Sequence, residues 1–117
     1  MPTYSRILLS GSTNGKPISV TDTSTPGTLI HTAAAGSTAF DEVYLWVSNL
    51  SGSAVALTLE WGGATDAELL VKALSIPANS DPIPVAVGQT LNGALEVRAF
   101  AATTAVLNIT GYANRIS

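Results

Sequence analysis

Two stretches in different halves of this chain alternate apolar and polar residues with the same spacing, and this alternation constrains the fold more than any other feature. Residues 43–61 carry an apolar residue at every second position on either side of a short segment at 51–53. Residues 95–109 repeat the pattern around residues 100–104. A period of two predicts β-strands, because successive side chains of a strand point to opposite faces. The positions expected to share one apolar face are Val43, Leu45, Val47, Leu57, Leu59, Trp61, Leu95, Val97, Leu107 and Ile109.

Each stretch is expected to form a β-hairpin, because a short connection commonly joins two antiparallel neighbours. Directly opposed residues of a hairpin share a face of the sheet. Two similar hairpins, one in each half of the chain, suit a two-sheet sandwich. The expected pairs are Val47 with Leu57, Leu45 with Leu59, Val43 with Trp61, Val97 with Leu107, and Leu95 with Ile109.

The remaining pattern predicts an all-β, single-domain β-sandwich of the jelly-roll kind, since short strands follow one another with turn residues between them. The prolines of residues 76–84 predict a surface loop along a sheet edge,. A short helix within residues 65–74 is the alternative to a strand there, because this segment holds good helix formers after an acidic start,. Strands are expected at about 28–33, 41–49, 54–61, 68–76, 83–87, 94–100 and 105–113,.

Glycine and proline divide the chain into two parts. Residues 1–26 are mostly polar and predict an N-terminal arm with short strands, whereas residues 27–117 predict the sandwich domain,. Within the arm, Asn14-Gly15 is a favoured two-residue turn, so a small hairpin between residues 7–9 and 18–20 is plausible,. The arm has few apolar residues of its own, and we expect it to order by lying on a neighbouring subunit.

Charge is sparse in this chain. Charged residues make up 11% of the 117 residues, against about 25% in an ordinary soluble domain. Such a neutral surface is expected where subunits pack together, and an alanine- and threonine-rich soluble domain is the plainer alternative. The net charge of −3 and the scattered cations argue against a nucleic-acid partner,. The absence of cysteine excludes disulfides and cysteine–zinc sites, and no segment has the length of a membrane span or the core of a signal peptide,.

No motif in the sequence predicts catalysis, a cofactor or a metal site, and we do not expect an enzyme. His31 is the only histidine and lacks a nucleophile motif, so we interpret it as a half-exposed strand residue,. Asp41 and Glu42 would point to opposite faces of a strand and are interpreted as solvated acids. A calcium ion at residues 63–68 is a weaker alternative, because the segment does not match an EF-hand loop.

The aromatic residues suggest a contact surface. If Val43, Leu45 and Val47 face the core, Tyr44 and Trp46 face outward, and the expected hairpin places them beside Thr58 and Glu60,. Tyr4 and Arg6 of the arm complete the candidate interface residues. The alternative is that the same chain covers this face with its arm or a loop.

Four segments, at residues 43–49, 57–63, 76–78 and 107–116, stand out by their pattern of expected strands and their composition. Together they resemble small structural proteins of tailed bacteriophages, in particular capsid decoration (cement) proteins. The resemblance covers roughly residues 40–117 and implies a β-sandwich, often a homotrimer, that binds the major capsid protein on the outside of a phage head. It also implies a virion protein that is made in the host cytoplasm. Two alternatives remain open, a carbohydrate- or receptor-binding module of a tail fibre or spike, and a head–tail joining protein.

Overall fold

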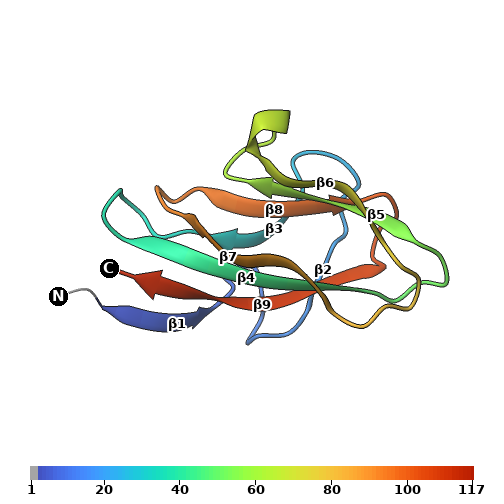
Figure 1. Ribbon diagram of the computed structural model, residues 1–117, viewed down its shortest axis with the longest axis horizontal. Helices are drawn as coiled ribbons and strands as arrows, with labels where there is room; N and C mark the ends of the chain where they lie inside the picture. Colours follow the sequence, from blue (N-terminus) through green and yellow to red (C-terminus); the bar gives the residue numbers. More distant parts are fainter. Residues whose placement is uncertain (1–2) are drawn as a thin grey trace.

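A computed structural model describes residues 3–117. It confirms the all-β prediction, with two antiparallel sheets that face each other across one core (Figure 1). The first sheet has the order β1-β9-β4-β7, and β2 also pairs with β9; the second has the order β3-β8-β5-β6. The strands are β1 (Tyr4–Leu8), β2 (Ile18–Ser19), β3 (Thr28–Thr32), β4 (Phe40–Asn49), β5 (Val55–Trp61), β6 (Leu69–Ile76), β7 (Ile83–Leu91), β8 (Glu96–Ala101) and β9 (Leu107–Ile116).

The inner faces of the two sheets form a single apolar core, and most of the residues expected there are present. Leu95 is the exception, because it lies in the turn before β8 and is 46% exposed. Trp61 is only partly buried at the margin of the core. The expected residues that are fully buried are Val43, Leu45, Val47, Leu57, Leu59, Val97, Leu107 and Ile109.

The two expected hairpins are wrong, because the strands of each stretch belong to different sheets. β4 pairs with β9, where Val47 lies opposite Ile109, and β5 pairs with β8, where Leu57 lies opposite Ala101. Each connection therefore crosses the core from one sheet to the other. We call residues 50–54 the first arch and residues 102–106 the second arch. An arch keeps the apolar faces of both its strands on the core, so it satisfies the same alternation as a hairpin.

The two arches lie side by side at one end of the sandwich. Leu50 of the first arch donates its backbone N–H to the carbonyl of Val106 (2.9 Å), and Ala102 of the second donates to the carbonyl of Ala56 (3.0 Å). Each arch thus supplies a backbone partner for the other stretch. The two stretches exchange strands, and neither stretch forms a sheet by itself.

Residues 3–26 are built into the sandwich of their own chain. Leu9, Ile18 and Val20 are buried in the core. β1 and β2 both pair with β9 and not with each other, so the small hairpin expected in this segment is wrong. Thr3 and Ser117 exchange backbone hydrogen bonds (2.7 and 2.9 Å), and Figure 1 shows both ends of the chain on one side. Residues 1 and 2 of the predicted arm lie outside the described residues.

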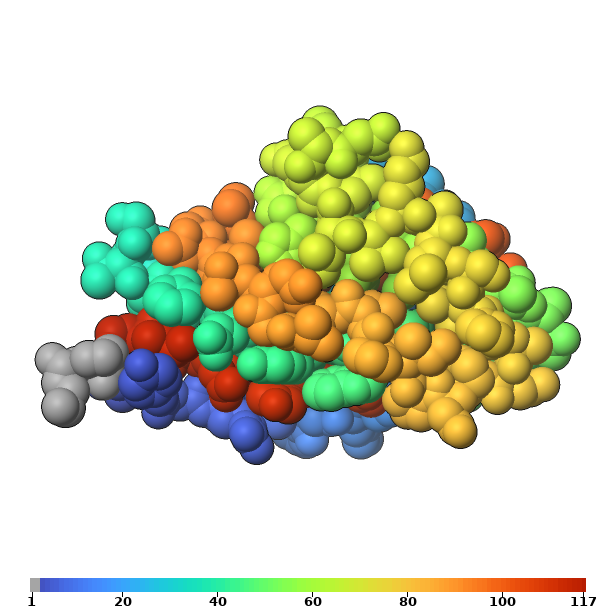
Figure 2. Space-filling view, viewed as in Figure 1, coloured from blue at the N-terminus to red at the C-terminus, as the bar shows by residue number. Residues whose placement is uncertain are grey.

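The segment at 65–74 is mainly strand. Only a single 3₁₀ turn, η1 (Asp66–Glu68), precedes β6. Glu68 accepts a hydrogen bond from the Thr65 hydroxyl (2.8 Å), which closes the turn. Figure 2 shows the turn standing out from the surface of the second sheet. The loop predicted at residues 76–84 is shorter than expected, because β7 begins at Ile83 and carries Pro84 on an edge strand, where a missing N–H is tolerated,.

Candidate functional site

The outer face of the first sheet presents a row of large apolar side chains. Leu8, Tyr112, Tyr44 and Val87 lie opposite one another on the neighbouring strands β1, β9, β4 and β7. Leu8 is 58% and Val87 62% exposed, and the two tyrosines are half-buried. We call these four residues and Trp46 the aromatic face. The outward side of an antiparallel sheet is commonly polar, and exposed apolar patches are typical of contact surfaces.

The rings of the aromatic face are packed together. Tyr44 and Tyr112 stack with their centroids 5.0 Å apart and their planes at 20°, and Trp46 lies 6.2 Å from Tyr112. The guanidinium carbon of Arg6 lies 4.6 Å from the centre of the Tyr112 ring. Gly88 makes room for this arrangement, because a Cβ atom at that position would lie 3.0 Å from the Tyr44 hydroxyl.

The structure divides the expected interface residues between two surfaces. Tyr44, Trp46 and Arg6 lie together on the outer face of the first sheet, and Tyr4, which is 71% exposed, lies on the same edge strand as Arg6. Thr58 and Glu60 belong to the second sheet and are buried, at 5% and 2% exposure. Their expected position beside Tyr44 and Trp46 is wrong, since β4 and β5 are not neighbours.

Tyr112 is the central residue of the aromatic face, and the sequence interpretation missed it. It lies directly opposite Tyr44 on β9. The alternation that places Leu107 and Ile109 inward continues to Ala113 after the irregular Gly111, so Tyr112 faces outward. This alternation is the sequence signal that predicts an outward direction for Tyr112. Only the pairing of β9 with β4 brings the two tyrosines together.

Glu60 and Thr58 are covered by other parts of the same chain. The Glu60 carboxylate accepts hydrogen bonds from the backbone N–H of Gly27 (2.6 Å) and from the hydroxyl of Thr25. The Thr58 hydroxyl accepts one from the backbone N–H of Ala73 (3.0 Å). The loop at residues 25–27 therefore lies over this part of the second sheet. A cavity of about 290 Å³ adjoins Glu60.

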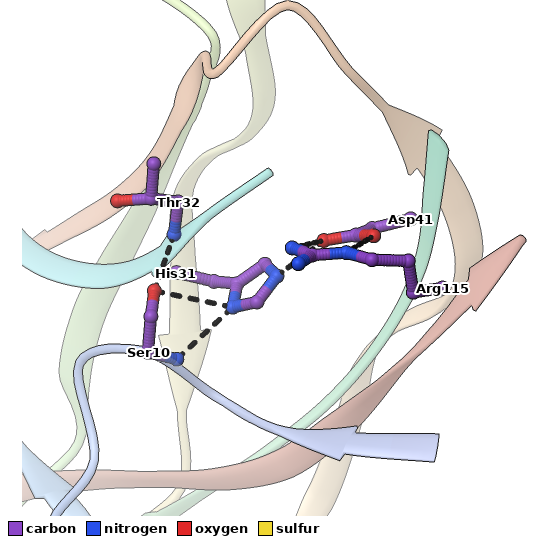
Figure 3. Close-up of polar contacts among 5 residues, drawn as sticks. All are labelled: Ser10, His31, Thr32, Asp41 and Arg115. Atoms are coloured by element: carbon purple, nitrogen blue, oxygen red, sulfur yellow. Dashed lines mark hydrogen bonds and ion pairs between the residues drawn. The ribbon is translucent and has the colours of Figure 1, made fainter. Parts of the chain in front are cut away.

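A buried polar cluster joins the N-terminal segment to the two sheets (Figure 3). Arg115 donates to both carboxylate oxygens of Asp41 at 2.8 and 2.9 Å, and His31 Nε2 lies 2.7 Å from Asp41 Oδ2. On the other side of the ring, the backbone N–H of Ser10 donates to His31 Nδ1 (3.0 Å). His31 is 1% exposed and Asp41 is fully buried, so the expected exposed histidine and solvated acid at these positions are wrong.

The cluster contains a serine, a histidine and an aspartate, but its geometry is that of a structural support. Ser10 N–H needs an unprotonated Nδ1, so the ring carries its proton on Nε2 and donates it to Asp41. Nδ1 is thus already engaged by a backbone donor when the Ser10 hydroxyl, 3.3 Å away, approaches it. That hydroxyl also accepts the N–H of Thr32 (2.6 Å). Both partners of the hydroxyl belong to β3, so it links the N-terminal segment to that strand.

The charge of Arg115 favours the ionised form of Asp41. Burial raises the pKa of Asp41, but hydrogen bonds from Arg115 and His31 and the charge of Arg115 lower it more, so the net pKa lies below the ordinary value of 3.8,. The hydrogen bond to Asp41 in turn raises the pKa of Arg115. Asp41 therefore remains a carboxylate at neutral pH and accepts three hydrogen bonds.

Residues 3–117 contain no group of three or more histidines and acids that is placed to hold a metal ion. The Glu68 carboxylate of the candidate calcium segment is turned to Thr65. No helix among the described residues is long and apolar enough to cross a membrane.

Comparison of the chain with models of protein families, with curated proteins and with solved structures finds no match. The functional argument therefore rests on the geometry of the sandwich and on the sequence resemblance described above.

Proposed function

We propose that this protein is a structural subunit that binds another protein surface through the aromatic face, and that it acts as a capsid decoration protein on the outside of a phage head. The aromatic face is the single observation that carries the proposal. Its rings are large, already packed and half-exposed, which are the properties of residues that dominate binding energy at protein interfaces. The resemblance of residues 40–117 to decoration proteins supplies the kind of partner, the major capsid protein.

The sparse charge of the chain supports the same proposal. Among the outward-facing residues of β1, β9, β4 and β7, the charged ones are Arg6 and Glu42. Both lie directly opposite Asn114 of β9, the strand between them. A surface with few charges is desolvated at low cost when it docks on another protein. Many copies on one shell would turn modest contacts into firm attachment through multivalency. A homotrimer suits this role, since closed cyclic symmetry buries the same neutral patch in every subunit.

No catalytic role is proposed for the serine, histidine and aspartate cluster, and the protein needs no cofactor in this function. His31 and Asp41 are buried, and the Ser10 hydroxyl accepts a hydrogen bond from the backbone N–H of Thr32. Such a network stabilises the junction between β1, β3, β4 and β9. The proposed place of action is the virion, after synthesis in the host cytoplasm.

A carbohydrate-binding module is the second candidate, because a row of aromatic rings on a sheet is also suited to stacking on sugars. The ring geometry favours protein binding over this alternative. Tyr44 and Arg6 approach Tyr112 from the two strands that flank it, so both sides of that ring are occupied. Trp46 remains as a ring that a sugar could approach.

Binding to heads that lack the protein tests the proposal. We expect the double variant Tyr44→Ala/Trp46→Ala to lose attachment in co-sedimentation while it remains folded, because both side chains point away from the core. Phe100→Ala is the matched control, since Phe100 is a half-buried aromatic residue opposite Thr58 in the second sheet. Equal loss in the control, or binding of the wild-type protein to a glycan array but not to heads, would contradict the proposal.

A further inference from the structure

The cavity beside Glu60 lies on the outer face of the second sheet, away from the aromatic face. Its volume is about 290 Å³, near the lower end of small-ligand pockets. Leu95 and Pro26 contribute apolar walls, and Glu60, Glu96 and Arg98 contribute the charged groups. Two carboxylates and one guanidinium give the lining a net negative charge, which disfavours an anionic ligand.

Of the two carboxylates that line the cavity, only that of Glu96 forms an ion pair with Arg98. Arg98 donates to Glu96 Oε1 from Nε (3.0 Å) and to the carbonyl of Gly27 (2.9 Å). It forms an ion pair with Glu96 and none with Glu60, although Glu60 and Arg98 lie opposite each other on β5 and β8. Within residues 3–117, Glu60 has no cationic partner.

A buried carboxylate without a cation is unusual, because the loss of hydration is ordinarily offset by an opposite charge. Glu60 is 2% exposed and accepts hydrogen bonds from two neutral donors, the N–H of Gly27 and the hydroxyl of Thr25. A carboxylate offers about four acceptor positions. Capacity for a further donor therefore remains beside the cavity, whose walls include the apolar side chains of Leu95 and Pro26.

The main chain keeps this cavity open. Gly62 and Gly63 form part of its wall, and Gly62 has a φ of +84°, a conformation that favours glycine,. The N–H of Gly62 donates to the carbonyl of Glu96 (2.9 Å), which fixes the wall against the start of β8. A Cβ atom on Gly62 would lie 3.3 Å from a methyl carbon of Leu95. One wall of the space is thus formed by backbone.

We propose that this cavity binds an aliphatic ammonium group. The ammonium would donate to the Glu60 carboxylate and supply the missing positive charge, while its alkyl chain packs against Leu95 and Pro26. A free alkylamine and the side chain of a lysine on another protein share this chemistry. The site is independent of the aromatic face and of the function proposed for it.

Titration with n-butylammonium, followed by the amide NMR signals of the protein, tests the proposal. We expect saturable shifts at Gly62, Gly63 and Leu95 with a dissociation constant in roughly the millimolar range, as suits a ligand of few heavy atoms. 1-Butanol has nearly the same shape without the charge and should give no saturable shift at these amides. Comparable binding of the two molecules, or no saturation with the amine, would overturn the proposal.

Two variants locate the contact. Glu60→Gln should weaken binding of n-butylammonium by at least about tenfold, because a charge-assisted hydrogen bond is lost. Glu42→Gln is the matched control, since it removes the same charge from the outer face of the first sheet and should leave the affinity unchanged. Ala64→Leu fills the cavity without touching Glu60 and should also abolish binding, which keeps the test decisive if Glu60→Gln folds poorly. Unchanged affinity in both Glu60→Gln and Ala64→Leu would place the amine elsewhere and overturn the proposal.

A second probe identifies the source of the ammonium group. N-acetyl-lysine methylamide carries the same alkylammonium on a peptide backbone. An affinity equal to that of n-butylammonium assigns the site to a lysine side chain, and a much weaker affinity assigns it to a free amine. Absence of saturable shifts with both probes overturns the proposal.

Discussion

Asp41 and Glu60 are both buried carboxylates on strands, yet their surroundings are opposite. Asp41 accepts two hydrogen bonds from the Arg115 guanidinium and one from His31. Glu60 accepts its hydrogen bonds from a backbone amide and a threonine hydroxyl. The first carboxylate has its charge matched within the chain, whereas the second leaves an unmatched charge beside a cavity. Burial alone therefore does not tell a structural acid from a binding one, and the partners of the carboxylate do.

Removing the matched carboxylate should have the largest effect. Asp41→Ala is expected to lower the free energy of unfolding by about 3–5 kcal/mol, because it leaves the Arg115 guanidinium and the buried His31 N–H without their acceptor. Urea unfolding measures the loss. Glu42→Ala, one residue away and directed outward, should cost less than about 0.5 kcal/mol. Similar losses in the two variants would show that Asp41 is not a structural acid.

Acid should weaken the fold through the same carboxylate. The pKa of Asp41 is lowered in the folded protein, so the unfolded chain binds the proton more readily. The stabilisation is present above about pH 4, near the unfolded pKa, and is lost as the pH falls through the lower folded pKa. Urea unfolding between pH 7 and pH 2.5 should show a steeper decline in the wild-type protein than in Asp41→Ala. Parallel curves would exclude Asp41 as the source of the decline.

The histidine of the cluster should contribute less than the aspartate. His31→Leu removes the acceptor of the Ser10 N–H and one donor to Asp41, and we expect a loss of about 1–3 kcal/mol for the unsatisfied buried groups. Hydrogen exchange gives a local measurement, since the Ser10 amide should exchange faster while amides in β6 remain protected. Unchanged exchange at Ser10 would mean that the Nδ1 contact does not hold the N-terminal segment.

The unmatched carboxylate should matter least for stability. Glu60→Gln keeps the shape of the side chain and one acceptor oxygen, and it removes the buried charge, so we expect a change of only about 0.5–1.5 kcal/mol. Thermal unfolding of Glu60→Gln and of Asp41→Ala under the same conditions compares the stability lost in the two variants. A loss as large as that of Asp41→Ala would show that both carboxylates are structural.

The sequence predicts the faces of the strands and does not predict their partners. Alternation fixes that Val47 and Leu57 point to the core, because a period of two is a property of each strand alone. The connection at residues 50–54 is compatible with a hairpin and with an arch, and alternation does not distinguish them. The side chain of Asn49 favours the arch, since its amide group donates to the carbonyls of Ser53 and Ile76 (2.9 and 3.0 Å). That second contact involves β6, a long-range partner that no local pattern reveals.

The candidate site was predicted in part for the same reason. Tyr44 and Trp46 face outward as expected, because their strand has a simple alternation. Glu60 also occupies an outward position, but the loop at residues 25–27 folds over it. His31 and Asp41 meet only because β3 and β4 lie in different sheets at the same end of the core. Covering loops and contacts between sheets are long-range properties, and a single sequence contains little information about them.

Because strands from different halves of the chain pair with each other, the sheets form only after the later strands have been made. β9 pairs with β1, β2 and β4, and β4 also pairs with β7. During synthesis, β1 and β2 therefore lack their strand partner until β9 has left the ribosome. Pairings over such long sequence separations fold slowly, on the order of milliseconds to seconds. The nascent chain thus exposes its apolar strands for most of its synthesis, and the prolines near β7 and the lysine of β6 help to keep these edges from pairing with other chains.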